Sequence, residues 1–225
     1  MRFFLDTASP AEIEKWDEFG VVQGVTTNPF LLSQEKADAH AQLKQIVDRV
    51  KGPVSAQVTH TNAESMVKQG LALRELGENV VVKLPSNIEG IKAAQTLVAK
   101  DVNVNITLAF DSAQLVLFSQ IPATYISLIL GKVEDFGKSN IAEISNSRQI
   151  LDNLHSHSQL LVASIRNSGH LIAAINGGAD VITVPPSTWT AIYNNPITRA
   201  LGDDFLNAWS NLDSSLRDGY HQAGE

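Results

Sequence analysis

Cysteine is absent from this sequence of 225 residues. Its absence excludes disulfide bonds, thiol nucleophiles and zinc sites built from cysteine. Long hydrophobic runs are absent as well, because no segment approaches the roughly 18 consecutive apolar residues of a membrane span. We therefore expect neither a disulfide-linked scaffold nor an integral membrane protein.

Excess positive charge is also lacking. The chain carries 17 Lys and Arg residues against 24 Asp and Glu residues, a formal net charge of -7. This mild acidity argues against nucleic acid or an anionic membrane as a partner. The first segment, MRFFLDTASP, contains an aspartate and no long apolar run, so it does not resemble a signal peptide, and we expect a cytoplasmic protein.

The sequence does contain a series of short apolar runs rich in β-branched residues. Eight of them recur about every 20 to 35 residues, which is the length of a βα unit. The runs are FFLDT (3–7), VVQGVTT (21–27), VSAQVT (54–59), VVVKLP (80–85), VNVNITLAF (102–110), TYISLIL (124–130), QLLVASI (159–165) and DVITVP (180–185). They predict one α/β domain over residues 1–225, a (β/α)8 TIM barrel; a doubly wound open sheet is the alternative.

Helix signals lie between these runs. Ser9 is expected to cap a helix that has Pro10 at its first position and Glu12 in its first turn. Ser86 and Glu89 repeat the same capping pattern before a second helix.

Other helices are indicated by apolar residues at helical spacing. One such stripe precedes Gly52 and consists of Leu43, Ile46, Val47 and Val50. After the eighth run, the segments STWTAIYNNP and ITRALGDDFLNAWSNL predict one or two terminal helices, with an extension from about residue 196. The second segment carries the apolar stripe Leu201, Phe205, Trp209 and Leu212.

Lys83 is unusual because it lies within VVVKLP, a run typical of a strand buried on both faces. Burial disfavours the charged ammonium and lowers its pKa, which leaves more of the free amine. A free amine on a rigid strand can form a Schiff base with a ketone or an aldehyde. Two alternatives stay open, namely an ion pair with a buried carboxylate and a lysine that binds an anion at the strand end.

Polar residues lie at or near the ends of nearly all these runs. In a (β/α)8 barrel, active groups gather at the C-terminal ends of the strands. The polar residues concerned are Asp6, Thr26, Thr27, Asn28, Gln57, Lys83, Asn105, Thr107, Ser127, Ser164 and Arg166. Packing alone does not explain a polar group at the exit of nearly every strand, so we predict that they form one active site.

Some of these residues have a structural alternative. Asp6 could transfer protons beside an amine, or it could cap the first helix. Gln57 could orient a water molecule that Thr107 shares, or both side chains could make ordinary core hydrogen bonds.

Two further groups raise the question of anion and metal binding. Ser164 and Arg166 are two residues apart, which places them on one face of an extended segment and suits phosphate recognition; a surface salt bridge of Arg166 is the alternative. Lys132 offers a second cation. The HSH segment (155–157) precedes a strand in polar surroundings, and we interpret it as a solvated loop and predict no metal site.

These motifs together resemble the transaldolase family, in its small subfamily of bacterial transaldolases and fructose-6-phosphate aldolases. The resemblance covers essentially the whole chain. Its most specific parts are four segments in the family's order: GVTTNP (24–29), VVKLP (81–85), NITLAF (105–110) and ASIRN (163–167).

The resemblance implies a (β/α)8 barrel that works without a metal or an organic cofactor. It implies that Lys83 forms the Schiff base, that Asp6 transfers protons and that Thr107 helps to fix the catalytic water. Gln57 completes the predicted catalytic set. The predicted substrate-binding residues are Thr26, Asn28, Asn105, Ser127, Lys132, Ser164 and Arg166.

The chain departs from the family pattern at three places. Transaldolases usually carry a glutamate where this chain has Gln57, whereas the aldolase branch has glutamine. The segment SLILGK has Leu128 and Ile129 where the aldolase branch has a tyrosine and transaldolases a phenylalanine. Lys132 replaces the usual arginine, which keeps the charge and loses the bidentate fork.

The sequence leaves more than one activity open. Asn105 and the missing tyrosine favour a transaldolase, which passes a dihydroxyacetone unit from a ketose phosphate to an aldose phosphate. Gln57 favours an aldolase that releases dihydroxyacetone. The same chemistry on a ketose with another terminal group, and a sugar-phosphate-binding protein without catalysis, are the alternatives. The family's small members assemble into rings, so we expect a homo-oligomer, with a pentamer and a decamer as the candidates. Its expected partners are small-molecule sugar phosphates.

Overall fold

The computed structural model describes residues 1–20 and 22–221. Within them, eight parallel strands pair in chain order and close into a barrel. The strands are β1 (Arg2–Asp6), β2 (Val25–Thr26), β3 (Val54–Gln57), β4 (Val80–Pro85), β5 (Val104–Ala109), β6 (Tyr125–Ile129), β7 (Gln159–Ala163) and β8 (Val181–Val184). The (β/α)8 prediction is confirmed, and closure of β1 onto β8 excludes the open sheet.

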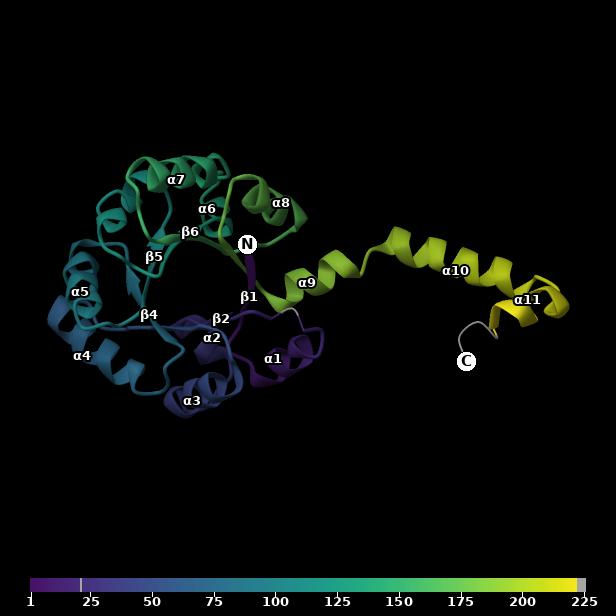
Figure 1. The fold of residues 1–225 in the computed structure, drawn as a ribbon, viewed down its shortest axis with the longest axis horizontal. Helices are drawn as coiled ribbons and strands as arrows, with labels where there is room; N and C mark the ends of the chain where they lie inside the picture. Colours follow the sequence, from purple (N-terminus) through teal and green to yellow (C-terminus); the bar gives the residue numbers. More distant parts are fainter. Residues whose placement is uncertain (21, 222–225) are drawn as a thin grey trace. The chain divides into compact units, whose positions relative to one another are not determined.

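Helices separate the strands of the barrel. They are α1 (Pro10–Asp17), α2 (Pro29–Gln34), α3 (Ala39–Arg49), α4 (Ala63–Arg74), α5 (Ile88–Val98), α6 (Gly131–Glu134), α7 (Ala142–Asn153) and α8 (Ser168–Asn176). Both α2 and α3 follow β2, and both α6 and α7 follow β6. Two short 3-10 helices, η1 (Ser112–Leu115) and η2 (Phe118–Gln120), lie between β5 and β6. Figure 1 shows the helices as a ring outside the strands. Each strand faces the helices on one side and the barrel interior on the other, and this is why the strands are apolar on both faces.

The second strand is shorter than the run 21–27 predicts. Only Val25–Thr26 is strand, and Val21 lies outside the described residues. The strand ends because Asn28 turns the chain into α2: its side-chain oxygen accepts a hydrogen bond from the backbone N–H of Leu31 at 3.0 Å. The helix-capping preference of asparagine thus competes with extension of the strand.

The capping predictions are confirmed in part. Ser9 stands at the N-cap of α1, but among the described residues its side chain makes no capping hydrogen bond. The predicted cap Ser86 is wrong, because Asn87 caps α5 by accepting a hydrogen bond from the N–H of Gly90 at 2.8 Å. Ser86 instead donates its hydroxyl to the carbonyl of Leu108 at 2.7 Å. An asparagine directly after Ser86 offers the better-placed acceptor.

The stripe before Gly52 packs as its spacing predicts. Leu43, Ile46 and Val47 are the buried apolar side chains of α3, and the helix ends at Arg49. The N-terminal end of the barrel is filled by Phe4 and Tyr125, whose rings meet edge to face with centroids 5.8 Å apart. This packed end leaves the opposite end of the strands for a site.

A second compact unit begins at Trp189, after a first unit that spans Met1–Thr188. Helix α9 (Pro186–Tyr193) crosses this boundary, and α10 (Pro196–Ser210) and α11 (Ser214–His221) follow. The part of the chain that the structure describes therefore has three helices after β8, where the sequence predicts one or two. In the second unit, the rings of Trp209 and Tyr220 lie 5.0 Å apart.

No helix in residues 1–20 and 22–221 is long and apolar enough to cross a membrane.

Candidate active site

A pocket of about 570 Å³ opens at the C-terminal ends of the strands. Seven of the eleven predicted site residues line it: Asp6, Asn28, Gln57, Lys83, Thr107, Lys132 and Ser164. Six of them come from strands or from the loops that directly follow strands, as the barrel geometry requires, and Lys132 lies in α6 after β6. The other four, Thr26, Asn105, Ser127 and Arg166, lie outside the described lining.

Lys83 is the buried cation of this pocket. Lys83 is only 6% exposed, and its ammonium nitrogen donates a hydrogen bond to the carbonyl of Thr27 at 3.1 Å. In the barrel register Lys83 stands beside Gln57 on one side and Asn105 on the other. Burial lowers the pKa of the Lys83 amine, and the negative charge of Asp6 opposes this effect in part.

Asp6 is the carboxylate of the same pocket. Burial raises its pKa, while the charge of Lys83 and a hydrogen bond from Thr26 act in the opposite direction. The Thr26 hydroxyl donates to Asp6 Oδ1 at 2.7 Å. Asp6 is thus engaged inside the barrel, and the alternative that it caps the first helix is wrong, since Ser9 occupies the N-cap position.

The opposite shifts of Lys83 and Asp6 have one physical cause. A buried site penalises both charged forms, so an amine loses its proton more easily and a carboxylate holds one more strongly. The pocket therefore combines an amine that is neutral to a larger extent, and so available as a nucleophile, with a carboxylate that is a stronger base than the same side chain would be in water.

Thr183 is a residue that sequence reasoning missed. Its hydroxyl oxygen lies 2.6 Å from that of Thr26. Because the single hydroxyl proton of Thr26 goes to Asp6, Thr183 donates to Thr26, and the two threonines form a directed chain that ends on the carboxylate. The signal was a threonine inside the apolar run 180–185, in register with Phe4 of β1.

Ser55 was missed in the same way. The amide nitrogen of Asn105 donates to the Ser55 hydroxyl at 3.1 Å, and Ser127 donates to the amide oxygen of Asn105 at 2.6 Å. All three residues are fully buried. The two bonds fix which way the Asn105 amide points. Ser55 stands two residues before Gln57 on β3, so strand alternation could have found it.

The end of β5 carries a strained turn. Leu108 has a φ of 63°, in the left-handed region that a bulky residue rarely adopts, and the register with β6 shifts between Ile106 and Ala109. Ser86 holds this turn by donating its N–H to the carbonyl of Thr107 and its hydroxyl to that of Leu108, both at 2.7 Å. The turn presents Thr107 to the pocket.

The predicted anion-binding end differs from expectation. Strand β7 ends at Ala163, and Ser164 has a φ of 60°, so the extended segment predicted for Ser164 and Arg166 does not form. Ser164 lines the pocket, while Arg166 makes a bidentate ion pair with Asp135 at 2.7 and 2.9 Å. The salt bridge that the sequence left as an alternative for Arg166 is therefore present.

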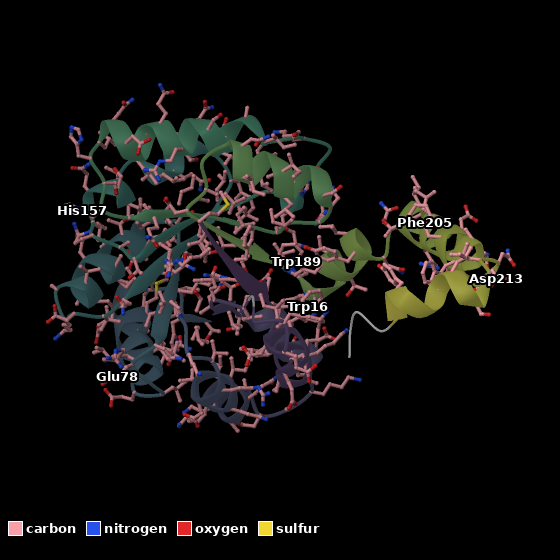
Figure 2. The ribbon with its side chains drawn as sticks, turned by 45° about the vertical axis from the view of Figure 1, so that its right-hand side comes forward. Trp16, Glu78, His157, Trp189, Phe205 and Asp213 are labelled. Atoms are coloured by element: carbon pink, nitrogen blue, oxygen red, sulfur yellow. The ribbon has the colours of Figure 1, made fainter. Side chains whose placement is uncertain are left out.

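The HSH segment lies away from the pocket, because it precedes β7. Among residues 1–20 and 22–221, no group of three or more His, Asp or Glu side chains could hold an ion. His155 and His157 are exposed, and Figure 2 shows His157 at the outer edge of the barrel unit. His157 also precedes β7, at the end of the barrel opposite the pocket.

Comparison with known proteins gives a consistent result. Residues 3–222 match the family described as Transaldolase/Fructose-6-phosphate aldolase. "Probable transaldolase 2" of Listeria monocytogenes is 40% identical over 209 residues, which cover 93% of this chain and 96% of that protein. "Probable transaldolase" of Maricaulis maris is 40% identical over 216 residues, covering 96% of this chain and all of that protein.

One solved structure shows the fold alone. The crystal structure of inosine 5'-monophosphate dehydrogenase from Legionella pneumophila superposes with a TM-score of 0.58 at 14% sequence identity. The match covers 83% of this chain and 58% of that one, so this chain spans less than two thirds of that protein.

The threonine chain generates a prediction about Asp6. Replacing Thr26→Val removes the hydroxyl that stabilises the charged carboxylate, so the pKa of Asp6 should rise further. The measurement is a pH titration of the Asp6 carboxyl carbon by NMR. Thr26→Ser keeps the hydroxyl and is the matched control. An Asp6 titration that is the same in Thr26→Val as in the unaltered protein would contradict the assignment.

Proposed function

Because the chain belongs to the transaldolase and fructose-6-phosphate aldolase family, we propose that it transfers a dihydroxyacetone unit through a Schiff base on Lys83. The donor is a ketose phosphate such as fructose 6-phosphate, and the acceptor is an aldose phosphate. The observation that carries the proposal is a buried lysine, with a lowered pKa, facing the same pocket as a half-buried carboxylate whose pKa is raised.

The reaction begins with the amine of Lys83. Its lone pair attacks the ketose carbonyl carbon, and loss of water from the carbinolamine gives the protonated Schiff base. Burial supports this step because it increases the share of neutral amine at a given pH.

Cleavage requires a base, and Asp6 is the carboxylate at hand. It takes the proton of the C4 hydroxyl, the C3–C4 bond breaks, and the bonding electrons pass into the Schiff base to give an enamine on Lys83. The aldose phosphate leaves. A raised pKa makes Asp6 a better proton acceptor for this step.

The polar residues around Lys83 suit the dihydroxyacetone unit. The amide oxygen of Asn28 accepts the hydrogen bond that caps α2, and its amide N–H groups can donate to substrate oxygens. Asn105 is held in one orientation by Ser55 and Ser127 directly beside Lys83 in register. Asn105 is fully buried outside the pocket lining, so the fixed donor that positions the ketose hydroxyls is the Asn28 amide.

The fate of the enamine separates the two activities of the family. A transaldolase lets it attack an acceptor aldehyde, while an aldolase protonates it and hydrolyses the product from the lysine. Ile129 lines the pocket where the aldolase branch has a tyrosine hydroxyl. An isoleucine cannot donate a proton, and this favours the transferase. Gln57, which also lines the pocket, favours fructose-6-phosphate aldolase activity as the second candidate.

The Schiff base itself is tested by chemical trapping. Borohydride added with fructose 6-phosphate should leave a reduced adduct on Lys83, read by mass spectrometry of the digested protein. Lys83→Arg should fold, give no adduct and lose at least about a thousandfold in turnover, because an always-protonated guanidinium cannot attack a carbonyl. Normal turnover by Lys83→Arg, or an adduct confined to another lysine, would overturn the proposal.

The choice between transferase and lyase is tested with the natural acceptor class. We expect glyceraldehyde 3-phosphate to be released from fructose 6-phosphate in the presence of erythrose 4-phosphate and far less without it. The matched variant is Ile129→Tyr, which restores a hydroxyl at this position and should raise release without the acceptor. Equal release by the unaltered protein in both tubes would establish the aldolase instead.

A further inference from the structure

Two cations, Lys132 in the pocket lining and Arg166 outside it, converge on a single carboxylate. Arg166 donates from both terminal nitrogens to the two oxygens of Asp135, at 2.7 and 2.9 Å. The ammonium of Lys132 lies 3.6 Å from Asp135 Oδ2. Arg166 follows β7, and Lys132 and Asp135 lie at α6, so one anion joins the two segments.

The stem of Arg166 is held in place before it reaches Asp135. A Cβ added at Gly131 would lie 2.6 Å from Arg166 Cδ and 2.7 Å from its Nε, so the arginine passes directly over a residue without a side chain. The backbone N–H of Arg166 also donates to Nδ1 of His170 at 3.4 Å, and His170 Nε2 lies 2.7 Å from a carboxylate oxygen of Glu134. The guanidinium therefore has a defined place beside Asp135.

The geometry of this pair is that of anion recognition. A guanidinium uses the same two-pronged edge for a carboxylate and for a phosphate, and a lysine adds a second point charge to either. The edge that would bind a phosphate is thus already filled. Of the three predicted phosphate ligands, Ser164 and Lys132 line the pocket. Arg166 lies outside the lining, with its guanidinium on Asp135.

We propose that Asp135 is a specificity-determining residue: its carboxylate occupies Arg166 and Lys132, and the terminal phosphate of the substrate binds by displacing it. This inference rests on the proposed function for the identity of the substrate. It does not depend on whether the enzyme is a transferase or a lyase.

Displacement is feasible because the ion pairs are accessible. The side chain of Asp135 is 46% exposed, and those of Arg166 and Lys132 are 35% and 63% exposed. Ion pairs in such surroundings are held weakly, since water competes for both charges. A phosphate dianion carries more charge than a carboxylate and more acceptor oxygens, so it can take over both cations.

The displaced carboxylate then opposes the bound phosphate. Asp135 remains at the C-cap of the four-residue helix α6, close to the new anion. Asp135 therefore lowers the affinity for phosphorylated substrates and leaves the affinity for substrates without a charged terminal group unchanged. Asp135 reduces the preference for a phosphate while leaving the chemistry at Lys83 unchanged.

The test is Asp135→Asn, which removes the charge and keeps the shape. Inorganic phosphate should bind several-fold more tightly to this variant than to the unaltered protein, measured by isothermal titration at low ionic strength. The KM for fructose 6-phosphate should fall by a similar factor. The ratio of kcat/KM for fructose 6-phosphate over that for fructose should rise. Asp135→Glu keeps the charge and should restore weak phosphate binding.

The matched control is Asp48→Asn on α3. It makes the same change of net charge in an exposed ion pair, that of Asp48 with Lys44, and should leave phosphate binding as it is. If Asp135→Asn binds phosphate more weakly, Asp135 positions Arg166 and the proposal is wrong. Unchanged binding would also refute it, because the carboxylate would then not compete.

Failure of the proposed function gives a different pattern. If borohydride leaves no adduct on Lys83 of the unaltered protein, the Schiff-base reaction is wrong, whatever Asp135→Asn does. The titration with inorganic phosphate needs no turnover, and it decides the competition by Asp135 in either case.

Discussion

Burial of the Lys83 amine is the constraint on which the rest of the site depends. Removing an ammonium from water is costly. The barrel offsets that cost in part with a hydrogen bond from Lys83 to the carbonyl of Thr27 and with the charge of Asp6. On the neighbouring strands, Gln57 and Asn105 stand in register with Lys83. A residue that is unfavourable for packing is thus retained where its chemistry needs a dry environment, and the surrounding polar residues are arranged around it.

Much of this arrangement follows from the sequence. Alternation of short apolar runs with helical stretches predicted the closed barrel and left the open sheet as the alternative, because parallel strands buried on both faces leave few other architectures. The lysine in VVVKLP and the polar residues near strand ends predicted seven of the residues that line the pocket. Ser55 and Thr183 escaped notice because a small hydroxyl residue within an apolar strand is compatible with simple packing, and only the closed barrel brings their partners within bonding distance.

The anion-binding end shows where local pattern has less power. Spacing of two residues predicts a common face only if the backbone stays extended, and Ser164 adopts a left-handed conformation. Sequence also gave no means to pair Arg166 with Asp135, which lies 31 residues away and on another element. Likewise α5 is capped by Asn87, the residue directly after the predicted cap Ser86. Tertiary contacts, and the choice between adjacent capping residues, are set by the whole fold.

The most direct test of this account is the pKa of the Lys83 amine itself. It can be measured by NMR titration of the carbon next to the amine, with the signal identified by its loss in Lys83→Met. The account predicts a midpoint below the 10.5 of an ordinary lysine, and a lower one still in Asp6→Asn, because the charge of Asp6 raises the pKa of Lys83. A midpoint at or above 10.5 would mean that Lys83 is a structural cation, and the proposed Schiff-base chemistry would lose its physical basis.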